Sequence, residues 1–128
     1  MKNQVVAHYA DGRILKGWAV DFFPNKTSFH LEREGPGETV EVQVGDLKGL
    51  FFVKTFAGNP GAKPNADSER AGMGRRIQVD FSDGETLMGY TSGYSPARVG
   101  FFVFPADPKD NNEKIYVVTA ATSAVSFV

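Results

Sequence analysis

Apolar residues recur along the chain in short runs that alternate with polar ones, not in long stripes with a helical period. No window of about a dozen residues keeps apolar side chains at every third or fourth position without a Gly or Pro interrupting it. The runs are bounded by Asp-Gly, Gly-Pro, Asn-Pro and Asn-Asn pairs, which are typical of turns. The pattern predicts an all-β protein.

Each half of the chain contains five predicted strands. They cover residues 5–10, 13–22, 28–33, 40–44 and 50–56 in the first half, and residues 77–82, 85–94, 100–104, 114–119 and 124–128 in the second. The pairs Asp11-Gly12 and Asp83-Gly84 predict tight hairpins, because such turns need a positive φ. Gly17 and Gly89, midway along the second strand of each half, predict a bend or bulge where the sheet curls.

The two halves resemble each other in sequence. A shift of 72 positions superposes Asp11-Gly12 on Asp83-Gly84, and it also superposes Leu15 on Leu87, Gly17 on Gly89, Pro24 on Pro96 and Phe29 on Phe101. After a three-residue insertion, a shift of 75 superposes Val40, Val42 and Phe52 on Ile115, Val117 and Phe127. We interpret this as an internal duplication, with units at residues 1–56 and 75–128 and a Gly/Pro-rich linker at residues 57–74. Units of this size bury little surface alone, so we expect them to pack together or against other chains.

Composition excludes several classes of function. Charge is balanced, with 14 Lys and Arg against 15 Asp and Glu, and gives no support for a polyanion partner. The absence of Cys excludes disulfides, thiolate zinc sites and a cysteine nucleophile. The first residues lack the apolar stretch of a secretory signal, and no apolar run is long enough for a membrane span. We therefore expect a soluble, cytoplasmic protein.

Candidate catalytic and metal-binding residues are few. His8 and His30, the only histidines, are flanked by core-type residues and are expected to face solvent instead of binding a metal. The loop at residues 107–113 gathers carboxylates and amides, but it lacks the spacing and central Gly of a calcium loop, so Asx turns are favoured and a bound cation stays open. Without a nucleophile beside a base, a metal set or a cofactor loop, we expect no enzymatic activity and no cofactor.

Aromatic residues are the most informative candidates. Phe51-Phe52 and Phe101-Phe102 place rings on both faces of a strand, because successive side chains point to opposite faces. Phe51 and Phe102, together with the loop residues Phe22, Phe23 and Tyr94, are therefore predicted to form contacts between units or between chains.

The five-strand unit resembles the small SH3-like barrel of Sm-like proteins. Asp21-Phe22-Phe23-Pro24-Asn25 is similar to the Asp-x-x-x-Asn loop of that family, and Leu47-Lys48-Gly49 lies where the family has Arg-Gly. The resemblance implies that these two loops hold RNA bases. The second half has Gly93 and Ala97 at the Asp and Asn positions. Through residues 47–53 and 100–108, the whole chain also resembles an uncharacterised bacterial family of unknown function.

These observations predict two tandem Sm-like barrels that act as a non-enzymatic binding or assembly module. Edge-strand pairing and apolar patches would join it to a protein partner or to further copies, with a homo-oligomeric ring as one form. The alternative is binding of RNA or single-stranded nucleic acid through Asp21, Asn25, Lys48 and Gly49. Arg75 and Arg76 follow two glycines but precede a strand, so they form no phosphate loop; they are expected to add a basic patch with Lys63 and Arg70.

Overall fold

The computed structural model describes residues 3–35, 37–58, 65, 68–70 and 72–128. The prediction of an all-β protein is confirmed, since the described residues contain ten strands, two short 3-10 turns and no α-helix. The strands are β1 (Asn3–Tyr9), β2 (Ile14–Ala19), β3 (Ser28–Arg33), β4 (Thr39–Gln43), β5 (Leu47–Val53), β6 (Arg75–Phe81), β7 (Thr86–Thr91), β8 (Gly100–Pro105), β9 (Asn112–Val118) and β10 (Thr122–Phe127). No helix in this part of the chain is long and apolar enough to cross a membrane.

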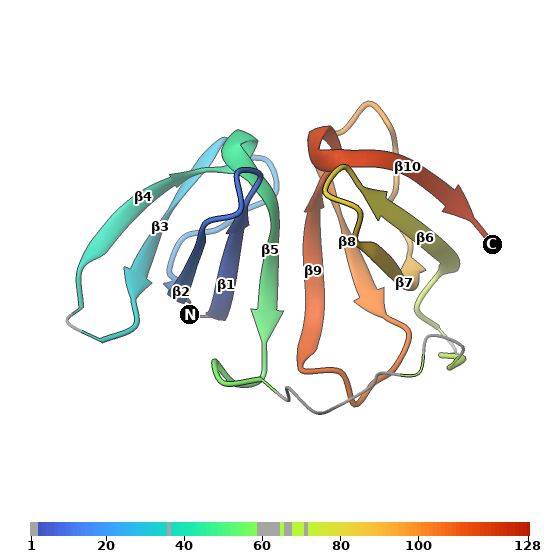
Figure 1. Cartoon of the computed structure of the whole chain (residues 1–128), viewed down its shortest axis with the longest axis horizontal. Coiled ribbons are helices and arrows are strands. Elements are labelled where there is room, and N and C mark those ends of the chain that lie inside the picture. The colour runs from blue at the N-terminus through green and yellow to red at the C-terminus, as the bar shows by residue number, and fades with distance from the viewer. Residues whose placement is uncertain (1–2, 36, 59–64, 66–67, 71) are drawn as a thin grey trace.

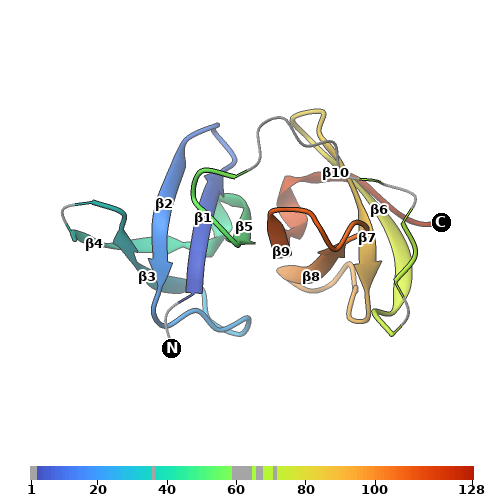
Figure 2. The same ribbon diagram turned by 90° about the horizontal axis from the view of Figure 1, so that it is seen from below.

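All ten strands belong to one open antiparallel sheet (Figure 1). Its order is β10-β6-β7-β8-β9-β5-β1-β2-β3-β4, so each half of the chain forms a run of five neighbouring strands. The two runs meet where β5 pairs with β9. Seen from below, they curl around separate interiors, and β4 lies at the outer end of the first run (Figure 2). Among the described strands, β4 and β10 have one neighbour each and form the edges of the sheet.

The boundaries of the fifth strand differ from the sequence prediction, and the difference changes the setting of three residues that were compared with the Sm-like loop. The fifth strand begins at Leu47 instead of residue 50, directly after the 3-10 turn Val44–Asp46, and it ends at Val53. Leu47-Lys48-Gly49 is therefore strand rather than loop. Residues 59–64, 66–67 and 71 of the predicted linker lie outside the described residues, as does Lys63 of the proposed basic patch.

Structural reasons require glycine at four positions that the sequence analysis singled out. Gly12 and Gly84 adopt φ values of 97° and 95° in the two hairpin turns, which confirms the Asp-Gly prediction. Gly17 lies so close to β3 that an added Cβ would be 2.1 Å from the backbone oxygen of Glu32, and at Gly89 the corresponding distance to Phe104 O is 2.2 Å. Only glycine allows the second strand of each run to approach the third this closely.

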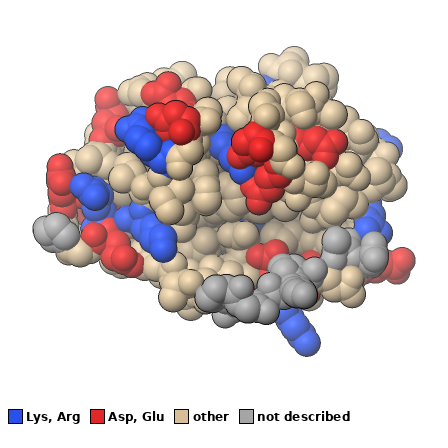
Figure 3. Space-filling model, viewed as in Figure 1, with Lys and Arg blue, Asp and Glu red and all other residues tan. Residues whose placement is uncertain are grey.

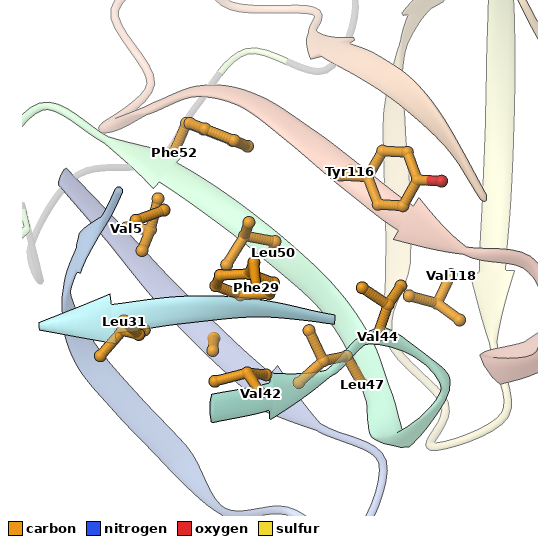
Figure 4. Packing of buried hydrophobic residues seen from close by; sticks show 12 residues of the cluster. Val5, Phe29, Leu31, Val42, Val44, Leu47, Leu50, Phe52, Tyr116 and Val118 are labelled. Atoms are coloured by element: carbon orange, nitrogen blue, oxygen red, sulfur yellow. The ribbon is translucent and has the colours of Figure 1, made fainter. Parts of the chain in front are cut away.

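Two hydrophobic cores lie on opposite sides of the central strands. The first core consists of Val5, Ala7, Ala19, Phe29, Leu31, Val42, Val44, Leu47, Leu50, Phe52, Tyr116 and Val118. The second core consists of Val6, Phe51, Val53, Ile77, Val79, Phe81, Phe101, Val103, Ile115 and Val117. Figure 4 shows Tyr116 and Val118 projecting from β9 toward first-core residues of the other half.

The central strands bury both faces because each face belongs to a different core. On β5, Leu50 and Phe52 enter the first core, whereas Phe51 and Val53 enter the second. Every residue of β5 is buried. The alternation of a strand thus explains why this segment is apolar at consecutive positions.

Candidate functional site

Four aromatic rings close the junction between the two halves. Phe22 and Phe52 come from the first half, and Phe102 and Tyr116 come from the second. The ring centroid of Phe22 lies 5.1 Å from that of Tyr116, and the centroids of Phe52 and Phe102 are 6.1 Å apart. The rings of this aromatic quartet meet edge-on or tilted, which is the favoured geometry. Lys114 Nζ lies 5.0 Å from the centre of Phe52 and 4.9 Å from that of Phe102, so a cation from β9 covers the rings.

The aromatic candidates from the sequence separate into two groups. Phe22 and Phe102 belong to the quartet, and Phe51 reaches the second core from the first half. Phe23 is 55% exposed in the β2–β3 loop, with Lys26 Nζ 5.5 Å from its ring centre. Tyr94 packs within its own half, 4.7 Å from Phe101 and 6.0 Å from Phe127. Three of the five therefore lie where the halves meet.

Lys48 connects the halves on the other face of β5. Its ammonium group pairs with Asp83 at 2.7 Å and with Glu85, and lies 4.6 Å from the ring centre of Phe81. Burial alone would lower the pKa of Lys48, but the hydrogen bonds to Asp83 and Glu85 outweigh it and raise that pKa. With 9% of its surface exposed, Lys48 is held within the fold and is not placed to bind a phosphate.

His8 stands beside this ion pair. Its ring lies 4.2 Å from that of Phe51, and burial together with the nearby Lys48 charge lowers the pKa of His8. Most Lys and Arg side chains on the face seen in Figure 3 lie next to Asp or Glu and the others are scattered, so the described residues form no continuous basic patch there.

A cavity of about 900 Å³ opens beside the junction. It is lined by the β2–β3 loop, the 3-10 turn after β4, the β7–β8 loop and Tyr116 of β9. Lys26 and Arg98, which are 72 positions apart, bring one cation from each half to this cavity, and Asn25 and Asp46 add an amide and a carboxylate. Burial raises the pKa of Tyr116, while Arg98 acts in the opposite direction. The lining thus combines two cations, an amide and a carboxylate with apolar side chains.

The six nucleic-acid candidates do not form one site. Asn25 lines the cavity, whereas Asp21, Lys48, Gly49, Arg75 and Arg76 do not. Asp21 accepts hydrogen bonds from the His30 backbone N–H at 2.6 Å and from His30 Nδ1 at 2.7 Å. Both bonds lower the pKa of Asp21, and the backbone bond has the larger effect. An added Cβ at Gly49 would lie 3.0 Å from Tyr116 O.

The two arginines lie on β6, far along the sheet from the junction strands. The guanidinium of Arg75 stacks 3.8 Å from the ring centre of Phe127, and Arg76 is half-buried. Arg70 donates a hydrogen bond to Pro105 O at 3.0 Å. Sequence reasoning missed Lys26, Arg98 and Tyr116, although the shift of 72 that pairs Lys26 with Arg98 was a usable signal.

The loop at residues 107–113 uses its carboxylates for turns. Asp107 accepts hydrogen bonds from the backbone N–H groups of Asn65 and Lys109, and these bonds lower its pKa. Asp110 accepts one from the N–H of Asn112 at 2.9 Å. The bonds from Lys109 and Asn112 are Asx-type turn bonds, whereas the bond from Asn65 joins the loop to a distant part of the chain. Within the described residues, no group of three His, Asp or Glu side chains is placed to hold a metal ion.

Comparison with known proteins identifies the family of the chain. No curated protein and no solved structure matches it. A family model described as a family of unknown function (DUF6982) matches residues 1–128. Because this match covers the whole chain, the protein belongs to the DUF6982 family.

Proposed function

We propose that the protein is a non-enzymatic protein-binding module made of two duplicated Sm-like units, which adds a partner strand at an open edge of its sheet. The positions of its elements support the duplication. β1, β3 and the turn after β4 begin at Asn3, Ser28 and Val44, and their counterparts begin 72, 72 and 75 positions later, at Arg75, Gly100 and Thr119. The strand order β5-β1-β2-β3-β4 in the first half matches β10-β6-β7-β8-β9 in the second.

The observation that carries the proposal is the pairing of β5 with β9. Positions 75 apart make β10 the counterpart of β5. In the first half this strand is covered by a strand of the other unit, whereas β10 has only β6 beside it among the described strands. An uncovered edge exposes a row of backbone N–H and C=O groups that an extended segment can pair with. The fold therefore contains one case of strand pairing between units, at β5 and β9, and one edge, at β10, that is free for such pairing.

A peptide selection tests this function. The immobilised protein is screened against a library of random extended peptides, and amide hydrogen exchange then maps each enriched peptide. We expect enriched peptides to slow exchange at β10 or β4, since strand addition protects edge amides. Light scattering over a range of protein concentrations, without peptide, shows whether copies of the chain pair with each other. The absence of enriched peptides together with a constant monomer mass, or protection confined to other regions, contradicts the proposal.

A second candidate function is binding of single-stranded nucleic acid at the cavity. It is favoured by one arrangement: Lys26 and Arg98 line the cavity beside Asn25, which combines two phosphate-binding cations with an amide that can hydrogen-bond a base edge. The test is an anisotropy titration of labelled oligo-U and oligo-A at low and moderate salt. We expect binding that weakens with salt and that falls further in Lys26→Gln and Arg98→Gln, because each removes a phosphate contact. No binding at low salt excludes this function.

A further inference from the structure

The exposed edge at β10 carries two aromatic rings that correspond to two members of the aromatic quartet. Shifts of 72 and 75 relate Phe22 to Tyr94 and Phe52 to Phe127. Tyr94 and Phe127 meet edge-on at 6.0 Å, much as Phe22 and Phe52 do at 5.9 Å. At the junction two rings from the other half complete the quartet, whereas Phe127 is 40% exposed and Val128 is 61% exposed. The edge thus presents an apolar surface that lacks its second half.

The β4 edge of a second copy of the chain does not supply the missing half. The same shifts relate Phe102 to His30, Tyr116 to Glu41 and Lys114 to Thr39, so the β4 edge offers polar groups where the β8–β9 side offers rings. His30 is, in addition, hydrogen-bonded to Asp21. Polar side chains on a free edge are a common means of preventing pairing between copies. The β4 edge of a second copy is therefore a poor complement to β10, which favours a strand of a different protein as the occupant.

The β5–β9 junction supplies a pattern for the register of that strand. Leu50 lies opposite Tyr116 and Phe52 lies opposite Lys114. A shift of 75 transfers these pairs to β10, so the partner places its aromatic residue opposite Val125 and the residue two positions before it opposite Phe127.

The partner residue opposite Phe127 is expected to differ in charge from its counterpart at the junction. At the junction this residue is Lys114, which covers Phe52. On β10 that place is already taken by Arg75, whose guanidinium lies 3.8 Å from the ring centre of Phe127. A second cation opposite Phe127 meets like charge, whereas a carboxylate pairs with Arg75.

We infer that β10 docks an extended segment of a partner protein that carries an Asp or Glu opposite Phe127 and, two residues later, a Tyr or Phe opposite Val125. This inference rests on the proposed function and specifies which edge is used and what it recognises. The partner strand would complete the aromatic surface of Tyr94 and Phe127, as β9 completes that of Phe22 and Phe52.

Three peptides test the inference on the full chain. The first has the sequence of residues 110–120, which contains β9; the second is the same peptide with Lys114→Glu; the third has the sequence of residues 37–45, which contains β4. We expect the Lys114→Glu peptide to bind about fivefold more tightly than the unmodified β9 peptide, and the β4 peptide to bind most weakly. Titration calorimetry measures the affinities, and hydrogen exchange at β10 locates the complex.

Matched protein variants separate the contributions of ring and charge. Arg75→Gln is expected to remove the preference for the Lys114→Glu peptide, and Phe127→Ser to weaken both β9-derived peptides about tenfold. Glu41→Gln, on the opposite edge, is the control and is expected to change neither affinity. Thermal unfolding verifies that each variant is folded.

Three outcomes overturn the inference: equal binding of the two β9-derived peptides, a β4 peptide that binds as well as they do, or unchanged binding by Phe127→Ser. If the random library nevertheless yields peptides that protect an edge strand, the proposed function stands. Only the inference that β10 selects an acidic and an aromatic residue then fails. If neither the library nor the three peptides bind at an edge and the chain stays monomeric, both fail.

Discussion

His8 is a single residue that makes stability depend on pH. Burial against Phe51 and the Lys48 charge hold its folded pKa below the ordinary 6.5. Between these two pKa values the unfolded chain binds more protons than the folded chain, so the free energy of unfolding is largest above pH 6.5 and falls as the pH drops through the folded pKa.

We expect His8→Gln to flatten this slope, measured as the difference between wild type and variant in urea unfolding from pH 8 to about pH 5. Because only the difference is used, contributions from other groups cancel. A difference that does not change with pH contradicts the assignment.

Gly17 is a residue at which no side chain fits. A Cβ there would lie 2.1 Å from Glu32 O, and the obstacle is backbone, which cannot simply rotate away. We expect Gly17→Ala to lower the free energy of unfolding by about 2–3 kcal/mol. Gly45→Ala is a matched control, since nothing lies within 4 Å of a Cβ at Gly45 and its φ is not positive; it should change stability by less than about 0.5 kcal/mol. Similar losses for both variants would contradict this explanation.

At the scale of the element, β5 belongs structurally to both halves. Phe51 is encoded in the first half but is 8% exposed within the second core. We expect Phe51→Ala to lower the free energy of unfolding by about 3–5 kcal/mol, as for a buried ring whose removal leaves a cavity. Phe23→Ala, in an exposed loop, is the control and should cost less than about 1 kcal/mol. Denaturant unfolding measures both, and a small effect of Phe51→Ala would mean that the second core does not depend on β5.

Some features of the strands and turns could be predicted from the sequence, and others could not. Hairpins at Asp11-Gly12 and Asp83-Gly84 could be predicted because their turns depend on local backbone chemistry. Two-sided strands could be predicted from consecutive rings such as Phe51-Phe52. The pairing of β5 with β9 could not, because residues 59 to 68 positions apart form it and alternation does not say which strand lies beside another. For the same reason the sequence could not predict that Lys48 pairs with Asp83 and Glu85, which come from the other half.

At the scale of the whole molecule, the two halves share their cores and should unfold together. Tyr116 and Val118 of the second half lie in the first core, and Val6, Phe51 and Val53 of the first half lie in the second. Separating the halves would expose the apolar side chains that β5 and β9 each place in the core of the other half, which costs free energy because apolar surface returns to water. We therefore expect the two halves to behave as one cooperative unit.

We expect one calorimetric transition whose calorimetric and van't Hoff enthalpies agree, and we expect residues 1–56 and 75–128, produced as separate chains, to be unfolded alone and to fold when mixed. Mixing restores the β5–β9 ladder and the cover over Phe51 and Tyr116, so native-like circular dichroism should return with a 1:1 stoichiometry. Phe51→Ala in the first fragment should weaken the reassembly, whereas Phe23→Ala should not. Two resolved transitions in the full chain, or a fragment that is folded and monomeric alone, would show that each half is stable without the junction. In that case the pairing of β5 with β9 would be a contact between finished domains, and it would no longer serve as the pattern for docking at β10.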